Sequence, residues 1–201
     1  MSATTNKRIL LGVSGGIAAY KSPDIVRRLR ERGFEVRVAM TSAACEFITP
    51  LTFQAVSGNP VHTNLLDARA EAAMSHIELA RWADTVLIAP ATADFIAKLA
   101  HGHADDLLST LCLATSAPLL LAPAMNQQMW NAQPTAANVA VLRALGVTLV
   151  GPGDGSQACG DVGPGRMLEP ADIAARVASI YNSERLQGLG VLVTAGATRE
   201  A

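Results

Sequence analysis

Short apolar runs, each followed by a turn and then by a helical pattern, constrain this chain most strongly. The runs are RILLGV (8–13), EVRVAM (35–40), DTVLIA (84–89), LLLA (119–122) and VTLV (147–150). Unbroken apolarity over four to six residues is typical of strands buried on both faces, and the intervening helices supply the covering layers. The sequence therefore predicts a three-layer α/β domain, Rossmann-like (flavodoxin-like), with an open parallel sheet and helices on both faces.

Helical patterns and breakers between the runs predict where the connecting helices lie. Gly33 is a plausible stop for the first helix, and Thr41 or Ser42 a plausible cap for the second. Pro90 and Pro123 are expected to close the third and fourth strands. The predicted helices are 17–32, one starting at 41–44, a long one over 93–115, 133–145 and 170–186.

Residues 151–169 interrupt the alternation, with six glycines and two prolines in GPGDGSQACGDVGPGRMLE. A segment this long without a helix or strand pattern is usually functional, so we interpret it as a flap over a site. The run 190–196 (GVLVTAG) starts a new strand and turn near the end of the chain. We therefore divide the chain into a domain over 1–188 and the truncated start of another over 189–201, or alternatively a native edge strand.

The composition argues against several classes of protein. The net charge is −1 and basic residues form no stripe, which argues against a nucleic-acid partner. No apolar run approaches the roughly 20 residues of a membrane span, and the N-terminus does not resemble a signal peptide, so we expect a cytoplasmic protein. Three scattered cysteines predict neither a disulfide framework nor a metal site, and His101 and His103 point to different helix faces.

The first strand ends in Gly12-Val13-Ser14-Gly15-Gly16 and leads into a helix. Such a turn offers backbone N–H groups, the positive helix end and the Ser14 hydroxyl to a phosphate. It is neither GxGxxG nor a P-loop, and no acidic residue ends the next strand to hold a ribose. This favours a mononucleotide such as FMN over a dinucleotide; helix–strand packing alone remains the other interpretation.

Small and hydroxylated residues follow three further strands of the predicted sheet. Thr41 and Ser42 follow the second strand, 90–94 (PATAD) the third, and 122–126 (APAMN) the fourth. Ligands of open α/β sheets bind at the carboxyl ends of strands, so these segments should share one crevice. Each residue taken alone is equally well explained as a helix cap.

Five segments resemble the homo-oligomeric flavin-containing cysteine decarboxylases, and within them the decarboxylase half of bacterial bifunctional phosphopantothenoylcysteine decarboxylase/phosphopantothenate–cysteine ligases. The PAMNQQMW and ACGDVGPGRMLEP blocks together are the most specific of them. The start of VLVTAGATRE (191–200) is similar to the opening of the ligase domain. The segments are 12–21 (GVSGGIAAYK), 75–84 (SHIELARWAD), 89–110 (APATADFIAKLAHGHADDLLST), 123–130 (PAMNQQMW) and 158–170 (ACGDVGPGRMLEP).

The resemblance implies FMN-dependent decarboxylation of 4′-phosphopantothenoylcysteine to 4′-phosphopantetheine in coenzyme A biosynthesis. Oxidation of the substrate thiol to a thioaldehyde creates a sink for the electrons that remain when CO₂ leaves, and FMNH₂ then reduces the product. Asp94 stands where asparagine is common in the family. The expected cofactor-binding residues are Gly12, Ser14, Gly15, Gly16, Thr41, Ser42, Pro90, Ala91, Thr92, Asp94, Ala124 and Met125.

Three residues match the catalytic positions of the family. His76 would manage the thiol proton, Asn126 would hold the substrate carboxylate, and Cys159 would protonate the product carbon. Without the resemblance they are explained as a helix-surface histidine, a helix cap and an inert loop thiol. The expected substrate-binding residues are Asn126, Ala158, Cys159, Gly165, Arg166 and Met167.

The remaining expectations concern assembly, alternatives and bystanders. The resemblance implies trimers with flavin between subunits, and dodecamers built from such trimers. A flavin prenyltransferase or a non-catalytic flavin-binding regulatory subunit of the same fold are the alternatives. Cys45 and Cys112 are interpreted as core residues, and Lys21 and Lys98 as solvated cations.

Overall fold

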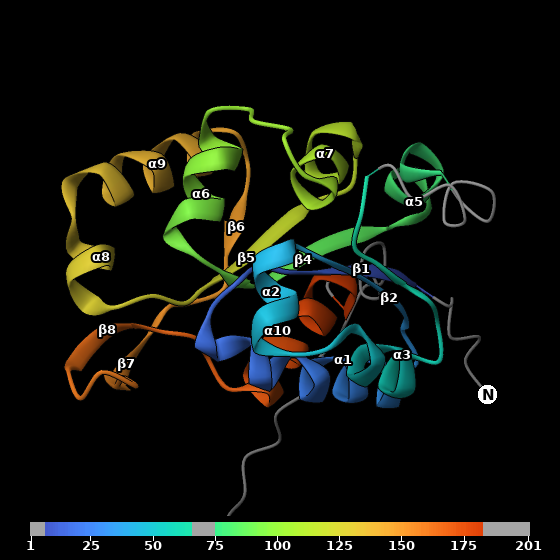
Figure 1. The fold of residues 1–201 in the computed structure, drawn as a ribbon, viewed down its shortest axis with the longest axis horizontal. Coiled ribbons are helices and arrows are strands. Elements are labelled where there is room, and N and C mark those ends of the chain that lie inside the picture. The colour runs from blue at the N-terminus through green and yellow to red at the C-terminus, as the bar shows by residue number, and fades with distance from the viewer. Residues whose placement is uncertain (1–6, 66–74, 183–201) are drawn as a thin grey trace, which may run out of the picture.

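The protein, seen as a computed structural model, is described over residues 7–65 and 75–182 (Figure 1). Within these residues, six parallel strands form one sheet in the order β3-β2-β1-β4-β5-β6. The open parallel α/β sheet predicted from the sequence is therefore confirmed. The strands are β1 (Arg8–Val13), β2 (Glu35–Met40), β3 (Val61–His62), β4 (Thr85–Ala91), β5 (Leu119–Pro123) and β6 (Thr148–Leu149).

The strand order changes direction between β1 and β4, because β2 and β3 lie on one side and β5 and β6 on the other. Such a switch point leaves a crevice at the carboxyl ends of the strands. The prediction that Pro90 ends the third strand is wrong: β4 continues to Ala91, which pairs with Pro123 of β5 after a shift in register. The two-residue β3 was not predicted, since it is too short to carry a pattern.

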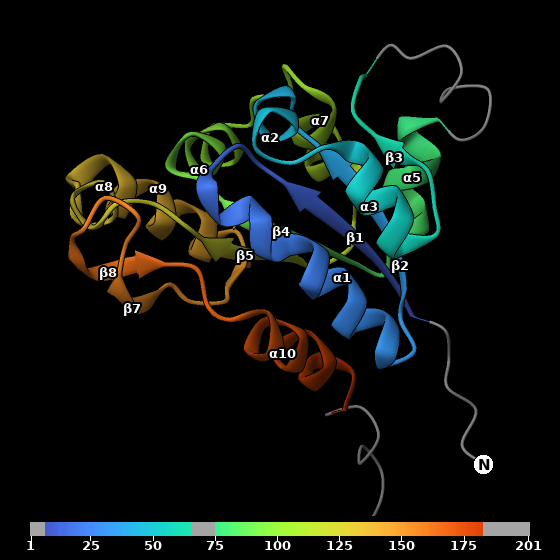
Figure 2. The same ribbon diagram turned by 60° about the horizontal axis from the view of Figure 1, so that its bottom comes forward.

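Helices cover both faces of the sheet (Figures 1 and 2). On one face α1, α3 and α10 enclose a core with Leu11 and Phe53 at its centre. On the other face α5, α6, α7 and α9 pack over Leu10 and Phe95. The helices are η1 (Ile17–Lys21), α1 (Ser22–Glu31), α2 (Ser42–Phe47), α3 (Pro50–Ser57), α5 (His76–Trp82), α6 (Ala93–Ala100), α7 (Leu107–Ala114), α8 (Gln127–Asn131), α9 (Gln133–Ala144) and α10 (Pro170–Asn182).

Several predicted helices are confirmed, but the long helix over 93–115 is wrong. The chain leaves α6 at His101, and Gly102 adopts a φ of 67°, which a helix cannot accommodate. Asp106 then caps α7 by accepting a hydrogen bond from the Ser109 backbone N–H at 2.8 Å. The first helix stops where predicted, with Gly33 at a φ of 85°. The break matters for the site because it turns the start of α7 toward the sheet edge.

The glycine-rich segment 151–169 contains regular structure that the sequence pattern did not predict. Strands β7 (Gly153–Ser156) and β8 (Val162–Arg166) pair antiparallel as a separate hairpin, which lies beside α8 (Figure 2). The predicted domain start over 189–201 and the end of the last predicted helix lie outside the described residues. In the part of the chain that the structure describes, no helix has the length and apolarity required to cross a bilayer.

Candidate active site at the carboxyl edge of the sheet

A cavity of about 890 Å³ lies at the switch point between β1 and β4, with the β7–β8 hairpin on one side. A volume of this size suits a cofactor together with a small substrate. The cavity brings together most of the residues predicted from the sequence. Those that line it are Ser14, Gly15, Gly16, Thr41, Ser42, Thr92, Asp94, Ala124, Met125, Asn126, Ala158, Cys159, Gly165, Arg166 and Met167.

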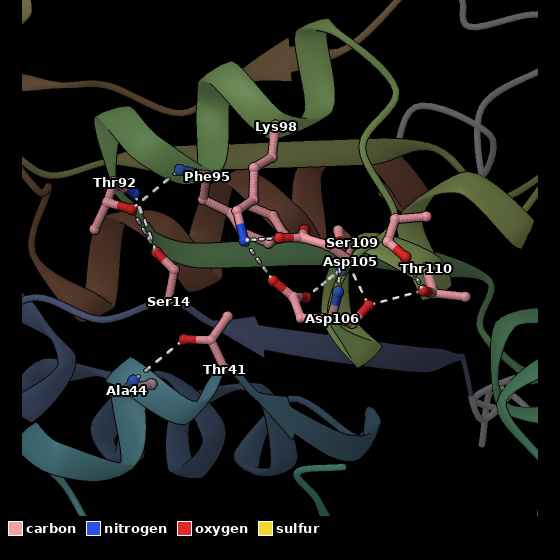
Figure 3. A network of polar contacts seen from close by, with 11 residues as sticks. Ser14, Thr41, Ala44, Thr92, Phe95, Lys98, Asp105, Asp106, Ser109 and Thr110 are labelled. Atoms are coloured by element: carbon pink, nitrogen blue, oxygen red, sulfur yellow. Dashed lines mark hydrogen bonds and ion pairs between the residues drawn. The ribbon is translucent and has the colours of Figure 1, made fainter. Parts of the chain in front are cut away.

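The turn after β1 is fixed by buried hydrogen bonds. The Ser14 hydroxyl, 2% exposed, donates to the Pro90 carbonyl oxygen at 2.7 Å and accepts from the Thr92 backbone N–H at 3.1 Å (Figure 3). Gly15 approaches α2 so closely that an added Cβ would lie 2.4 Å from the Ala43 Cβ. The turn thus joins the ends of β1 and β4 and brings α2 against them.

Three helices begin at the cavity, and each is capped by a side chain from a strand end. Thr41 accepts from the Ala44 N–H at 3.1 Å, Thr92 from the Phe95 N–H at 3.3 Å, and Asn126 from the Gln128 N–H at 2.7 Å. The capping interpretation of these residues is therefore correct. It is compatible with binding, because the caps direct the positive ends of α2, α6 and α8 toward the cavity, where an anion is stabilised.

Lys98 is not the solvated cation that the sequence suggested. Its Nζ lies 3.0 Å from Asp105 and 3.1 Å from Asp106, and both Lys98 and Asp106 line the cavity (Figure 3). The hydrogen bond to Asp105, reinforced by Asp106, raises the pKa of Lys98. The same bond lowers the pKa of the Asp105 carboxyl group. Lys98 therefore presents a positive charge held in place by two carboxylates.

A second charged cluster lies at the base of the hairpin, where Lys21, Glu169 and Arg166 meet. The Lys21 ammonium, with its side chain only 10% exposed, and the Arg166 guanidinium share one Glu169 oxygen at 2.9 and 2.7 Å. The hydrogen bond from Lys21 is the main cause of a lowered pKa at Glu169. The prediction that Lys21 is solvated is wrong. Two cations against one carboxylate leave this part of the cavity with a net positive charge.

The hairpin contributes a thiol that faces Asn126. The amide nitrogen of Asn126 lies 3.2 Å from the Cys159 sulfur and donates to the Asp161 carboxylate at 2.7 Å. Gln157 fixes the hairpin to α8, because its Oε1 accepts from the Gln127 backbone N–H at 3.0 Å. Gly165 allows this close approach: an added Cβ would lie 2.5 Å from the Met125 carbonyl oxygen. Two residues far apart in the sequence thus meet at one wall of the cavity.

Four predicted site residues do not line the cavity of this single chain. Gly12 is required for packing, since an added Cβ would lie 2.5 Å from side-chain atoms of Ile88 and Leu108. Pro90 and Ala91 are strand residues behind the cavity wall, where the Pro90 carbonyl holds Ser14. His76 is the first residue of α5, which packs against α7 away from α8 and the hairpin (Figure 1).

Sequence reasoning also missed residues that the cavity contains. Ile17, Tyr20 and Lys21 of η1 line the cavity, although no residue of η1 was assigned to the site. Ser156 and Gln157 also line it, whereas only other residues of the hairpin were predicted. A helical or glycine-rich pattern gives no sign of which of its residues face a ligand. Met129 also lines the cavity, with 48% of its surface exposed.

The three cysteines differ sharply in environment. Cys159 is exposed at the cavity, whereas Cys112 is 6% exposed in the core of α7. Burial raises the pKa of Cys112 to about 12, with the Asp106 charge adding to it. Cys45 is half-buried, and its pKa is also raised, chiefly by burial. The core assignment of Cys112 is confirmed, and Cys159 is the accessible thiol of the described residues.

The arrangement can hold an anion at the helix ends and a planar apolar group beside Met125 and Met129. It places a neutral amide and a thiol next to that space. Over residues 7–65 and 75–182 no group of three or more metal-ligating side chains is close enough to bind an ion. The side chains of Asn126 and Cys159 offer hydrogen bonding and proton transfer at the cavity wall.

A scan of protein families matches the Flavoprotein model to residues 2–182. The chain belongs to the Flavoprotein family. A curated relative from Vibrio vulnificus (strain YJ016), "Coenzyme A biosynthesis bifunctional protein CoaBC", is 59% identical over 201 residues, covering 100% of this chain and 50% of the relative. The protein of the same name from Escherichia coli (strain K12) is 60% identical over 195 residues, covering 96% and 48%.

Solved structures place this Flavoprotein-family chain among proteins of the same fold. A mutant PPC decarboxylase complexed with pantothenoylaminoethenethiol is 34% identical, with a TM-score of 0.78, covering 88% of this chain and 99% of its own. The FMN-binding protein AtHal3 is 34% identical, with a TM-score of 0.75, covering 89% and 98%. The chain spans about half the length of the curated relatives that it matches.

Proposed function

We propose that the chain binds FMN and decarboxylates (R)-4′-phosphopantothenoylcysteine to 4′-phosphopantetheine, a step of coenzyme A biosynthesis. The observation that carries the proposal is the pairing of Asn126 with Cys159, 3.2 Å apart, at the wall of a cavity that the starts of α2 and α6 also line. A flavoprotein family, coenzyme A biosynthesis relatives and PPC decarboxylase neighbours all agree with it.

The cavity fits FMN in two respects. The Ser14–Gly16 turn and the capped starts of α2 and α6 suit the phosphate, because they combine small residues with positive helix ends. The apolar side chains of Met125 and Met129 suit the ring system. FMN, when bound, supplies a two-electron acceptor for the carbon that carries the substrate thiol and returns the hydride after CO₂ has left.

The side chains of this chain bind substrate and move protons. Asn126 donates an N–H to the substrate carboxylate, and its neutrality avoids an ion pair that would retain the charge. His76 takes the proton of the substrate thiol and later returns it to sulfur. The bond to CO₂ breaks with its electron pair left on the substrate as an enethiolate, and the Cys159 S–H then protonates the carbon that lost CO₂. Ala158, Gly165, Arg166 and Met167 surround the substrate.

His76 reaches the reaction only if subunits share active sites. We propose trimers, and dodecamers built from them, in which His76 of one subunit enters the cavity of its neighbour. Ile77 of α5 and Leu113 of α7 are large apolar side chains exposed by 37% and 64%, and α5 packs on α7. An apolar surface next to His76 is what such an interface requires.

Incubation of the FMN-loaded protein with phosphopantothenoylcysteine tests the activity. We expect CO₂ release and a product whose mass is that of 4′-phosphopantetheine. The Cys159→Ser variant should release a decarboxylated product lighter by two hydrogens, because reduction stalls when the carbon is not protonated. A preparation that does not bind FMN contradicts the proposal. One that binds FMN but leaves the thiol acid unchanged contradicts the decarboxylase activity, and prenyl transfer or flavin binding without catalysis then remain as explanations.

Mixed oligomers test the sharing of sites. Neither His76→Asn nor Cys159→Ser alone is expected to form the saturated product. In a trimer that contains both variants, some cavities combine an intact His76 from one subunit with an intact Cys159 from its neighbour. We expect activity to reappear when the two variants are unfolded together and reassembled, and light scattering should give the mass of a trimer or dodecamer. If the mixtures stay inactive although each variant binds FMN, the sharing of active sites between subunits is contradicted.

The domain boundary and the location of the protein are parts of the same proposal. We assign 1–188 to the decarboxylase and 189–201 to the start of a phosphopantothenate–cysteine ligase domain, in line with the CoaBC relatives, of which the chain covers half. A cytoplasmic location suits the mechanism, because an exposed Cys159 thiol persists in a reducing compartment. Limited proteolysis of the longer protein should cut near residue 188 if the two parts are separate domains.

A further inference from the structure

Asp161 touches both Asn126 and Cys159, yet it does not itself line the cavity. One oxygen, Oδ2, accepts a hydrogen bond from the Asn126 amide at 2.7 Å and one from the Cys159 thiol at 3.5 Å. The only other acceptor described for the thiol, the Gln157 amide oxygen, is 3.9 Å away. A single carboxylate oxygen therefore connects the two side chains that the proposed reaction places at the substrate.

These contacts fix the Asn126 side chain at both ends. Its oxygen accepts from the Gln128 backbone N–H at 2.7 Å, which directs its nitrogen toward the hairpin and Asp161. The second amide hydrogen faces the Cys159 sulfur at 3.2 Å. A substrate carboxylate is a stronger acceptor than a thiol sulfur, so it can replace that contact without disturbing the bond to Asp161.

The position of the sulfur follows from the same geometry. The carbon that must be protonated is the one bonded to the carboxylate that Asn126 binds. A sulfur atom 3.2 Å from the Asn126 nitrogen is therefore adjacent to that carbon. Rotation about the Cβ–Sγ bond turns the thiol hydrogen from Asp161 toward the substrate without displacing the sulfur.

We propose that Asp161 is a positioning residue that holds the Cys159 thiol and the Asn126 amide in one arrangement for protonation of the decarboxylated carbon; this inference rests on the proposed function. In the step, the S–H bond breaks and a C–H bond forms at the substrate, while the S–H electron pair stays on sulfur. The resulting thiolate takes a proton from water. Asp161 neither gains nor loses a proton.

The side chain of Asp161 can be changed without removing the bonds that shape the hairpin turn. The turn is closed by backbone groups: the Gln157 N–H donates to the Asp161 carbonyl at 2.8 Å, and the Gly160 N–H to the Gln157 carbonyl at 2.9 Å. A substitution at Asp161 therefore tests its carboxylate rather than the fold. Asp154, exposed on β7 of the same hairpin and outside the cavity lining, provides a matched control.

The experiment compares Asp161→Ala, Asp161→Asn and Asp154→Ala in the FMN-loaded protein by the ratio of oxidised to saturated product. We expect Asp161→Ala to raise this ratio about fivefold to tenfold, the factor for one lost hydrogen bond of ordinary strength, with the FMN absorbance unchanged. Asp161→Asn keeps an oxygen that can accept both bonds, so its ratio should stay within about twofold of the wild type. Asp154→Ala should match the wild type.

A double variant places the effect at Cys159. On a Cys159→Ser background, Asp161→Ala should leave the product ratio where Cys159→Ser alone sets it. The inference fails if Asp161→Ala gives the wild-type ratio, or if Asp161→Asn is as impaired as Asp161→Ala. A wild-type protein that releases no CO₂ contradicts the proposed function itself, which is a distinct result.

Discussion

The two sides of the cavity are built by different means. At the sheet edge, Ser14 is buried and bonded to the backbone of Pro90 and Thr92, and the caps at Thr41 and Thr92 are bonds to main-chain N–H groups. On the hairpin, by contrast, Cys159 and Arg166 are exposed, and the contacts to Asn126 and Glu169 run between side chains.

These two kinds of contact indicate which side of the cavity is formed before a ligand binds. Bonds from buried groups to backbone are costly to break, because the partner is left unsatisfied in a site that water does not reach. Exposed side-chain contacts cost little free energy to break, because water replaces them. The sheet edge is therefore suited to hold a resident cofactor, and the hairpin to rearrange as substrate enters and product leaves.

Alkylation of the cysteines should give the largest contrast between the two regions. A thiol with a pKa of about 12, as in Cys112, has only ~10⁻⁴ of its population as the reactive thiolate at pH 8. Cys159 is exposed, so iodoacetamide should label it at least about a hundredfold faster. Peptide mass mapping over time measures both rates, and Cys112 should react only after denaturation. Equal labelling in the native state contradicts this account.

Alanine substitutions of two neighbouring glycines should show whether the sheet edge is tightly packed at one of them and open at the other. Gly15→Ala places a Cβ 2.4 Å from the Ala43 Cβ and 2.8 Å from its backbone carbon, so α2 must shift. We expect the free energy of unfolding to fall by about 1–3 kcal/mol, the usual cost of overpacking. Denaturant titration measures it in protein freed of FMN.

Gly16→Ala is the matched control for that substitution. The nearest atom to its added Cβ is the Thr92 Cγ2 at 3.4 Å, and a φ of −175° is open to any residue. Its free energy of unfolding should change by less than about 0.5 kcal/mol. If Gly15→Ala proves as harmless as Gly16→Ala, the sheet edge is less rigid than the contacts with Ala43 indicate.

The same contrast explains how far the sequence could predict the molecule. β1 and β2 were predicted to the residue because buried parallel strands leave short, mainly apolar runs. The caps were predicted because Thr41 and Thr92 act within three residues of themselves. The long helix over 93–115 failed at Gly102, since a periodic apolar pattern continues across a short turn.

The rest of the site depends on contacts that no local pattern encodes. Lys21 meets Glu169 across 148 positions and Asn126 meets Asp161 across 35, so only the fold reveals them. The β7–β8 hairpin has glycines where strand propensity would require branched residues, and its pairing was invisible for that reason. His76 came from a resemblance, and its place outside the single-chain cavity is what the subunit-mixing experiment must explain.

The Lys21–Glu169 contact at the base of the hairpin should make only a small, pH-dependent contribution to the free energy of unfolding. Lys21 lowers the pKa of Glu169 below its usual 4.5, so the bond contributes stability above that pH and loses it as the pH falls through the lowered value. Because Glu169 is 52% exposed, the contribution should be at most ~1 kcal/mol. Denaturant titrations of the wild type and Glu169→Gln should therefore differ slightly at pH 7 and converge as the pH falls through the lowered pKa of Glu169, since effects of other carboxylates cancel in the difference. If the wild type instead gains stability relative to Glu169→Gln on acidification, the carboxylate is destabilising at neutral pH. The hairpin would then be held by its backbone, as the sheet edge is.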